Sequence, residues 1–342
     1  MRVLIIKTSS MGDVLHTLPA VQDAASQLPG IQFDWVVEEA FQDIPHWHPA
    51  IKEVIPIAIR RWRKNIWSAW SSGEPQDFIR RLQKVSYDVV IDAQGLFKSA
   101  CISRLTKGLR VGFNYKTARE PIAAIAYQKK FSIPRDLHAI TRLRQLFANA
   151  LGYQIPAGDL EYGTILQSTR LLTTQEPYLV FLHSTTWDSK HWPELYWQEL
   201  IRLANSAGFQ VLLPWGTHRE KMRAERLAHA GAKVLPKLTI NEMAHLLQQA
   251  QGCVAVDTGL GHVAAAVGAP TVSLYGPTHP GLTGAIGKHQ QHLSVQKNCA
   301  PCFKKTCRFI DAPILPPCFM TLSPEQVWSS LYGLLVTKEN QI

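Results

Sequence analysis

An aspartate just after the first apolar run is the residue of this chain best suited to accept a proton. Asp13 follows the continuous apolar run 3–6 and a small polar turn that contains Gly12. Helical spacing of apolar residues resumes at Val14, so the carboxylate lies at or near the first turn of a helix, where the dipole keeps it ionised. Asp13 could instead be only a helix cap. Gly12 favours a binding role, because a residue without a side chain lets a ligand approach the backbone.

A second polar turn has the composition of a diphosphate-binding site. The apolar run 178–183 is followed by Thr185, Thr186 and Lys190, and Pro193 suits the first turn of the next helix. Hydroxyl groups, backbone N–H groups and a lysine at the start of a helix are the donors that phosphate oxygens need. Lys190 is therefore a candidate for neutralising a diphosphate.

A third turn combines an acid with two glycines. The apolar residues 253–256 run into Asp257-Thr-Gly-Leu-Gly-His262. Gly259 and Gly261 would leave backbone N–H groups open to phosphate oxygens at the start of a helix. The spacing matches neither the G-x-G-x-x-G motif of dinucleotide-binding folds nor the lysine loop of P-loop nucleotidases.

A compact basic run, residues 60–64, follows the predicted strand 54–57. Such a run is usually a solvated loop, but Trp62 within it favours binding, because an exposed tryptophan is seldom kept without a contact. His138 lies in a predicted helix over 136–151. Other polar side chains of this half also follow predicted strands, namely Lys7, Gln94, Lys98 and Arg119. Together they predict a surface for a polyanionic partner.

Apolar runs and helical periodicity alternate along the chain, which predicts an α/β fold with parallel sheets. Strands are expected at 3–6, 32–37, 54–57, 87–92, 111–113, 178–183, 209–213, 234–236, 253–256 and 271–278, the last closing the second sheet. Glycines and prolines between residues 152 and 177 mark a junction. A chain of 342 residues exceeds one ordinary core. We therefore expect two Rossmann-like domains, 1–165 and 175–323, with a linker at 166–174.

The composition is that of a globular protein with an anionic partner. Hydrophobic residues make up 46% of the chain, charged residues 18%, and the net charge is +10. Nucleic acid is disfavoured, because the basic residues are dispersed among loops rather than gathered on one face with stacking aromatics. No signal peptide or membrane-spanning run is predicted, so a cytoplasmic location is expected.

Cysteines concentrate near the end of the chain. Cys299 and Cys302 form a C-x-x-C pair, and Cys307 and Cys318 follow. Four such residues could bind zinc, but the irregular spacing of the second pair leaves a structural thiol cluster or a disulfide as the favoured alternatives.

Six motifs, taken in order, resemble the lipopolysaccharide heptosyltransferases of glycosyltransferase family 9, and most closely the heptosyltransferase I group. They are residues 7–13, 60–64, 92–96, 117–121, 190–193 and 257–260. Each motif is weak alone, and the ordered set is specific. The cysteine-bearing tail differs from heptosyltransferase I and is similar to that of heptosyltransferases II and III.

The resemblance implies a GT-B glycosyltransferase with two Rossmann-like domains facing across a cleft and a closing helix, 324–340, that packs back on the first. It implies inverting transfer of L-glycero-D-manno-heptose from ADP-heptose to the Kdo of Kdo2-lipid A, with no cofactor or metal. Peripheral contact with the anionic cytoplasmic face of a Gram-negative inner membrane is also implied. The alternatives are heptosyltransferase II or III and, since GT-B epimerases share the architecture, a nucleotide-sugar epimerase. An epimerase would leave the basic run without a role.

The resemblance also implies roles for individual residues. Asp13 is expected to be the general base and Lys190 the group that neutralises the leaving diphosphate. The expected donor-binding residues are Ser9, Ser10, Gly12, Thr185, Thr186, Glu220, Leu238, Asp257, Thr258, Gly259, Leu260 and His262. The expected acceptor-binding residues are Lys7, Arg60, Arg61, Arg63, Lys64, Gln94, Lys98, Arg119 and His138.

Overall fold

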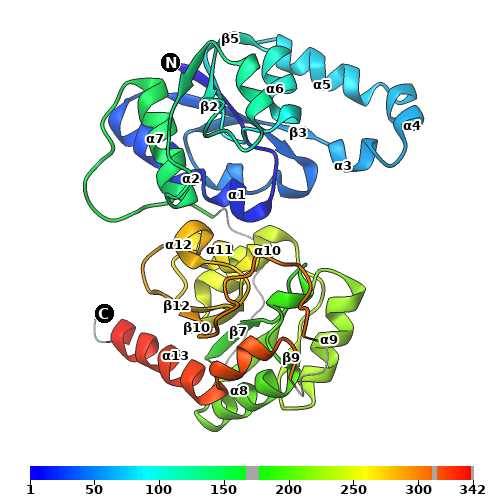
Figure 1. Cartoon of the computed structure of the whole chain (residues 1–342), viewed down its shortest axis with the longest axis vertical. Helices are drawn as coiled ribbons and strands as arrows, with labels where there is room; N and C mark the ends of the chain where they lie inside the picture. Colours follow the sequence, from blue (N-terminus) through cyan, green and yellow to red (C-terminus); the bar gives the residue numbers. More distant parts are fainter. Residues whose placement is uncertain (167–176, 310–313, 340–342) are drawn as a thin grey trace. The chain divides into compact units, whose positions relative to one another are not determined.

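Two parallel sheets, one in each half of the chain, organise the computed structural model (Figure 1). The structure describes residues 1–166, 177–309 and 314–339, without the side chains of 337–339. The chain divides into a first unit, Met1–Ile165, and a second unit, Leu166–Ile342. Nearly all of the linker predicted at 166–174 lies outside the described residues.

The first unit alternates strands and helices, with η marking 3₁₀ helices. Its elements are β1 (Arg2–Ile6), α1 (Met11–Leu15), α2 (Leu18–Gln27), β2 (Gln32–Glu38), η1 (Glu39–Phe41), η2 (Pro45–Trp47), β3 (Ile51–Ile57), α3 (Ile59–Trp62), α4 (Ile66–Ser71), α5 (Glu74–Gln83), β4 (Ser86–Asp92), α6 (Phe97–Arg104), β5 (Lys107–Phe113), η3 (Pro121–Ala126), β6 (Lys129–Phe131) and α7 (Ala139–Leu151).

Helices cover both faces of the first sheet, which explains why its central strands are apolar throughout. On one face, Val36 of β2 belongs to a cluster with Phe78 of α5 and Ile102 of α6. On the other, Phe33 packs against Phe147 of α7 with ring centroids 6.3 Å apart. The strand order is β3-β2-β1-β4-β5-β6, and every pairing is parallel.

The second unit repeats this plan. Its elements are β7 (Tyr178–Leu182), η4 (Asp188–Lys190), α8 (Glu194–Ser206), β8 (Gln210–Leu213), α9 (His218–Ala228), β9 (Lys233–Val234), α10 (Ile240–Gln249), β10 (Gly252–Val256), α11 (Gly259–Ala266), β11 (Thr271–Tyr275), α12 (Pro280–Thr283), β12 (Gln290–Ser294), η5 (Pro317–Thr321) and α13 (Pro324–Glu339). The sheet order is β12-β11-β10-β7-β8-β9.

Both sheets have the same topological switch point. Counted within each unit, the strand order is 3-2-1-4-5-6. The connection after β1 therefore runs toward one edge of the sheet and the connection after β4 toward the other edge. The same holds for β7 and β10 in the second sheet. In open α/β sheets, ligands bind in the crevice beyond the carboxyl ends of the strands at such a point. The turns after these four strands are therefore the places where a site is expected.

Local breaks differ from the sequence-based expectations. The first predicted helix is divided into α1 and α2, and Pro19 lies in the first turn of α2, where its missing N–H does no harm. The basic run is partly helical, because α3 ends at Trp62. His138 is the N-cap of α7 rather than part of the helix. The second sheet does not close at β11, since β12, a polar edge strand with no apolar run to predict it, pairs outside it.

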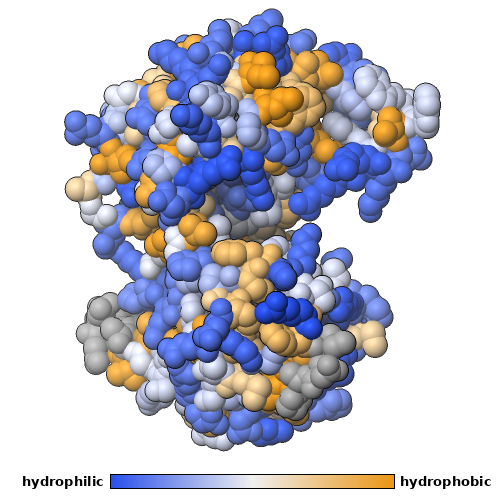
Figure 2. Space-filling view, in the orientation of Figure 1, coloured by the Kyte–Doolittle hydropathy of each residue, from blue (hydrophilic) through white to orange (hydrophobic). Residues whose placement is uncertain are grey.

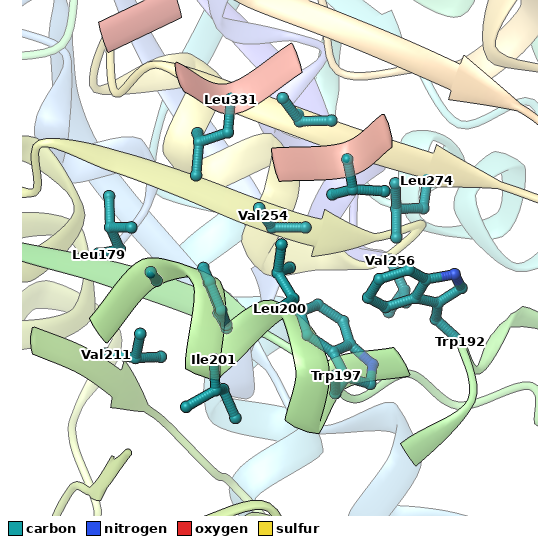
Figure 3. Packing of buried hydrophobic residues seen from close by; sticks show 14 of the residues in the cluster. Leu179, Trp192, Trp197, Leu200, Ile201, Val211, Val254, Val256, Leu274 and Leu331 are labelled. Carbon is teal, nitrogen blue, oxygen red and sulfur yellow. The ribbon is translucent and has the colours of Figure 1, made fainter. Parts of the chain in front are cut away.

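The last helix packs in the core of the second unit. Val327, Leu331 and Leu335 of α13 are buried in the core cluster of the second unit. A side chain at Gly252 of β10 would meet Leu335 at 2.9 Å, so the glycine permits close docking of the helix. Figure 3 shows Leu331 beside Val254 within this cluster.

We predict that Leu331→Ala destabilises the protein by about 2–5 kcal/mol, because a fully buried leucine leaves a cavity when it is truncated. Tyr332→Ala on the same helix is the matched control, since this side chain is 50% exposed. Urea unfolding followed by circular dichroism measures both. Equal, small effects of the two substitutions would contradict the docking of α13 in this core.

Candidate active site

Asp13 lies at the carboxyl end of β1 with its carboxylate held but still accessible. The backbone N–H and hydroxyl of Ser10 donate to Asp13 Oδ2 at 2.8 and 3.0 Å. Lys7 Nζ lies 3.5 Å from Oδ1, and Arg119 lies 3.9 Å from Oδ2. The Asp13 side chain is 28% exposed. The residue therefore caps α1 and also presents a carboxylate to solvent, so the two interpretations of it are compatible.

Charge balance keeps Asp13 ionised. Burial raises the pKa of its carboxyl group, but Lys7, the Ser10 backbone N–H, His16 and Arg119 oppose this and hold the pKa well below its usual range. Burial lowers the pKa of Lys7, and Asp13 opposes that shift. The ion pair between them keeps the Asp13 carboxylate ionised at neutral pH.

Gln94 joins the turns after β1 and β4. Its side-chain oxygen accepts from the N–H groups of Thr8 and Ser9 at 3.0 and 3.2 Å, and the residue is only 5% exposed. Lys7 Nζ donates to Ala93 O at 3.0 Å across the same junction. Gln94 thus links the two turns, and its contact with an acceptor stays a prediction.

Close approach at Gly95 brings Arg119 to Asp13. Gly95 has φ +66°, and a side chain there would lie 3.4 Å from Arg119 N. The Gly95 carbonyl accepts from Glu120 N at 2.9 Å. Arg142 donates to Thr117 O at 2.7 Å and so holds the same loop from behind. The guanidinium of Arg119 remains 65% exposed beside the carboxylate.

The basic run is not one uniform surface. Arg61 forms ion pairs with Glu39 at 3.0 Å and with Glu74 at 2.8 Å, and these partners raise its pKa above the usual range. Trp62 donates to Glu74 at 2.8 Å and packs against Phe78. The contact that Trp62 required is therefore internal, and its use as evidence for a ligand was wrong.

The other predicted acceptor residues differ in exposure. Arg60 lies over the ring of Phe41, while Arg63 and Lys64 are exposed and form no ion pair among the described residues. Lys98 Nζ lies 3.5 Å from Ser9 Oγ. His138 is buried, and its Nδ1 accepts from Ile140 N at 3.2 Å. His138 therefore starts α7 rather than facing solvent.

Lys190 and Asp257 form the centre of the second unit's site, at the ends of β7 and β10. Lys190 Nζ lies 2.6 Å from Asp257 Oδ2 and 4.5 Å from the ring centre of Trp187. Thr185 Oγ1 donates to Asp257 O at 3.0 Å, and Thr278 Oγ1 donates to Asp257 Oδ2 at 2.6 Å. Thr278 was missed in the sequence, although its place after β11, the strand beside β10, could have indicated it.

The helix after β10 begins without a side-chain cap. Thr258 is the N-cap of α11 and makes no side-chain capping bond, and the first turn contains no acid. Gly261 allows the helix to lie against β10, because a side chain there would reach Ala255 at 3.4 Å. This arrangement, with Gly259 and Leu260 in the first turn, favours an anion. His262 is buried on the same helix.

Three more residues were predicted to bind the donor, and they lie in the loops after β7 and β9 and at the start of α9. Thr186 is exposed after β7, and Leu238 is half-buried in the loop after β9. Glu220 accepts from the N–H groups of Gly216 and Thr217 at 2.8 and 2.7 Å as part of the cap of α9. Glu220 therefore has a structural role, with or without a ribose. Across residues 1–166, 177–309 and 314–339, no helix is long and apolar enough to cross a membrane.

Comparisons with known proteins agree on one family. The family model described as glycosyltransferase family 9 (heptosyltransferase) matches residues 76–312. Lipopolysaccharide heptosyltransferase 1 of Pseudomonas aeruginosa is 50% identical over 352 residues, with 99% of each chain covered. Lipopolysaccharide heptosyltransferase 2 of Salmonella typhimurium is 22% identical over 354 residues, covering 98% of this chain and 99% of that one.

Solved structures agree with these relatives. Escherichia coli heptosyltransferase WaaC with ADP superimposes with a TM-score of 0.81 at 49% identity, covering 86% of this chain and 94% of that one. The same enzyme with ADP-2-deoxy-2-fluoro heptose gives a TM-score of 0.78 at 48% identity, with the same coverage.

We predict that Asp13→Asn lowers stability at pH 7 by about 1 kcal/mol or more, because Lys7 loses its charged partner. The folded-state pKa of Asp13 lies below its unfolded value of about 4. Its contribution is therefore present above that value and is lost as the pH falls through the folded-state pKa. The difference in the free energy of unfolding between the wild type and the variant should be constant from about pH 5 to 7 and should decrease below about pH 4. Urea unfolding at several pH values measures this difference, and Asp136→Asn, at an exposed position, is the control. A difference that increases in acid would refute the ion pair between Lys7 and Asp13.

Proposed function

Since the chain belongs to glycosyltransferase family 9, the heptosyltransferases, we propose that it transfers L-glycero-D-manno-heptose from ADP-heptose to the Kdo of Kdo2-lipid A. The observation that carries this is the 50% identity to lipopolysaccharide heptosyltransferase 1 over 99% of both chains. The 22% identity to a heptosyltransferase 2 disfavours a later inner-core acceptor, despite the cysteine-bearing tail. An epimerase would have no use for an acceptor surface.

The second unit supplies the donor site in this proposal. The diphosphate of ADP-heptose would lie at the start of α11, where the backbone N–H groups of Gly259 and Leu260 favour an anion. Lys190 would exchange its 2.6 Å contact with Asp257 for a phosphate oxygen, or bridge the two. Thr185 and Thr186 add hydroxyl donors, and Glu220 and Leu238 would flank the nucleoside. Asp257 would then be free to accept heptose hydroxyl groups.

The reaction is a single in-line displacement. Asp13 takes the proton from the acceptor hydroxyl as its oxygen attacks the anomeric carbon. The bond between that carbon and the diphosphate oxygen breaks on the opposite side, so the configuration inverts and ADP leaves. Lys190 and the α11 N–H groups stabilise the charge that develops on the leaving oxygen. An ionised Asp13 is the state that this role requires, and the charges around it supply it.

The first unit supplies the acceptor site. Arg119 beside Asp13 suits the carboxylate of a sugar acid, and Lys98 lies near the same turn. Arg63 and Lys64 offer further exposed charge. Arg61 is a weaker candidate than its place in the motif suggested, because Glu39 and Glu74 already balance it.

An exposed apolar turn next to these charges fits peripheral contact with an anionic membrane on its cytoplasmic side. In α4, the side chains of Ile66, Trp67 and Trp70 are 58%, 87% and 57% exposed. Figure 1 shows α4 at the periphery of the first unit, and Figure 2 shows mainly side chains of intermediate hydropathy there, with hydrophilic ones nearby. Tryptophan favours the interface between lipid and water, and adjacent basic residues favour anionic headgroups.

We predict that Asp13→Asn binds ADP-heptose with unchanged affinity but loses turnover by about a hundredfold or more, because only the base is removed. Calorimetric titration measures the donor affinity, and release of ADP in the presence of Kdo2-lipid A measures the turnover. Asp136→Asn should match the wild type in both. Retained turnover would exclude Asp13 as the base, and consumption of ADP-heptose without an acceptor would exclude the transferase assignment.

We predict that replacing Trp67 and Trp70 by alanine weakens binding to phosphatidylglycerol-containing vesicles by about tenfold or more, because buried aromatic area is lost. Co-sedimentation measures the binding. Leu195→Ala is the control, since this side chain is 70% exposed in the second unit. Binding of the tryptophan variant equal to that of the control would show that α4 is not the membrane contact.

A further inference from the structure

Four cysteines surround one cavity in the second unit. Cys299, Cys302, Cys307 and Cys318 line a space of about 200 Å³. The remaining two of the six lie elsewhere, Cys101 exposed on α6 and Cys253 buried in β10. The chain therefore brings together thiols that are up to nineteen positions apart, while it keeps its other two separate.

The segment that carries these cysteines has little other internal structure. Between β12 and η5, the described residues 295–309 and 314–316 form neither helix nor strand. A long irregular segment within a packed domain needs something other than backbone ladders to hold it. Metal ions bound by cysteines do this in many small modules, where binding energy contributes directly to folding.

The lining of the cavity has the charge that a metal–thiolate centre requires. A divalent ion with four thiolates carries a net charge of −2. Lys304 and Arg308 line the cavity together with the cysteines, and the described residues add no carboxylate to its lining.

We propose that Cys299, Cys302, Cys307 and Cys318 bind one transition-metal ion, zinc or iron, through four thiolates. Among the described residues, no three His, Cys, Asp or Glu side chains are grouped closely enough to hold a metal ion as they stand. Binding would therefore move the four sulfurs inward, to about 2.3 Å from the ion. Each thiol gives its proton to solvent as the ion binds, and no electron transfer is needed.

The irregular residues 295–309 and 314–316, here called the cysteine segment, form hydrogen bonds with η4, the element that contains Lys190. Ser189 N donates to Lys305 O at 3.1 Å, and Ser189 Oγ donates to Lys304 O at 2.5 Å. These carbonyls lie between Cys302 and Cys307 in the chain. Fixing the two cysteines therefore fixes the backbone on which Ser189 rests.

The same segment also holds the turn after β11. Phe303 N donates to Pro277 O at 2.8 Å, and Thr278, the next residue, contacts Asp257. Gly276 accommodates the ring of Phe319, which follows Cys318, because a side chain there would lie 2.7 Å from that ring. The ion would thus position the Lys190 and Thr278 contacts to Asp257 from behind. This consequence, unlike metal binding itself, rests on the proposed donor site.

Elemental analysis of the untagged full-length protein tests the site directly. We expect about one equivalent of zinc or iron per chain after purification without chelator. A mercurial that titrates thiols should release the ion to a chromophoric chelator. Iron would give visible thiolate-to-metal absorption and zinc would not, which separates the two ions. Protein that contains neither metal and takes up neither Zn²⁺ nor Co²⁺ after reduction would overturn the proposal, as would a mass showing disulfides among these cysteines in freshly prepared protein.

Matched variants assign the ligands. Cys302→Ser and Cys307→Ser should each lose most of the bound metal, whereas Cys101→Ser should retain it. If a ligand variant does not fold, mercurial release from the wild type still decides the question. Metal-depleted wild type should bind ADP several-fold more weakly than the loaded protein. Unchanged ADP affinity would overturn the positioning role and leave the metal site standing. No ADP binding by the loaded protein would count against the donor assignment instead.

Discussion

Parallel pairing of β1 with β4, and of β7 with β10, is the constraint on which the candidate site depends. In each pair the two strands point the same way, so the turns that follow them meet at one edge of the sheet. In the first unit this places Asp13 beside the turn that contains Gln94. In the second it places Lys190 beside Asp257. Residues some 67 to 81 positions apart in sequence become neighbours only because these strands are adjacent.

Each unit holds a lysine of its candidate site in an ion pair with an aspartate. Lys7 is buried next to Asp13, and Lys190 is largely buried next to Asp257. A buried charge without a partner is costly, so removing either member of a pair would destabilise the protein. A ligand that offers the same charge can replace the internal partner without exposing a bare ion. In the proposed reaction, such an exchange would let Lys190 turn from Asp257 to the departing diphosphate.

Elements that follow the last central strand determine how the second unit is completed. The helix α13 packs over Gly252, and Phe319 packs over Gly276. A side chain at either glycine would collide with these residues, so the two glycines allow this close packing. The cysteine segment fills the space next to η4 and the turn after β11. The described residues 295–309 and 314–336 thus belong to the second unit, where they contribute to its core and support its polar turns.

The sequence by itself determined the fold class, the central strands and the location of the key turns. Apolar runs such as 3–6 and 253–256 signal buried parallel strands, and the short polar segments after them mark strand ends, because these signals are local. The same local signals made Asp13, Lys190 and Asp257 candidate site residues, and their roles stay predictions. It also supplied the family through six ordered motifs, which the comparisons confirmed.

Only the tertiary structure decided which polar side chains face solvent and which hold the protein together. Gln94, Arg61 and His138 looked alike as candidate ligands, yet one joins two turns, one is paired with two glutamates and one caps a helix. Trp62 found its partner in Phe78, and β12 pairs despite its polar sequence. These outcomes depend on register and on neighbours distant in sequence, and no local pattern of composition or period contains that information.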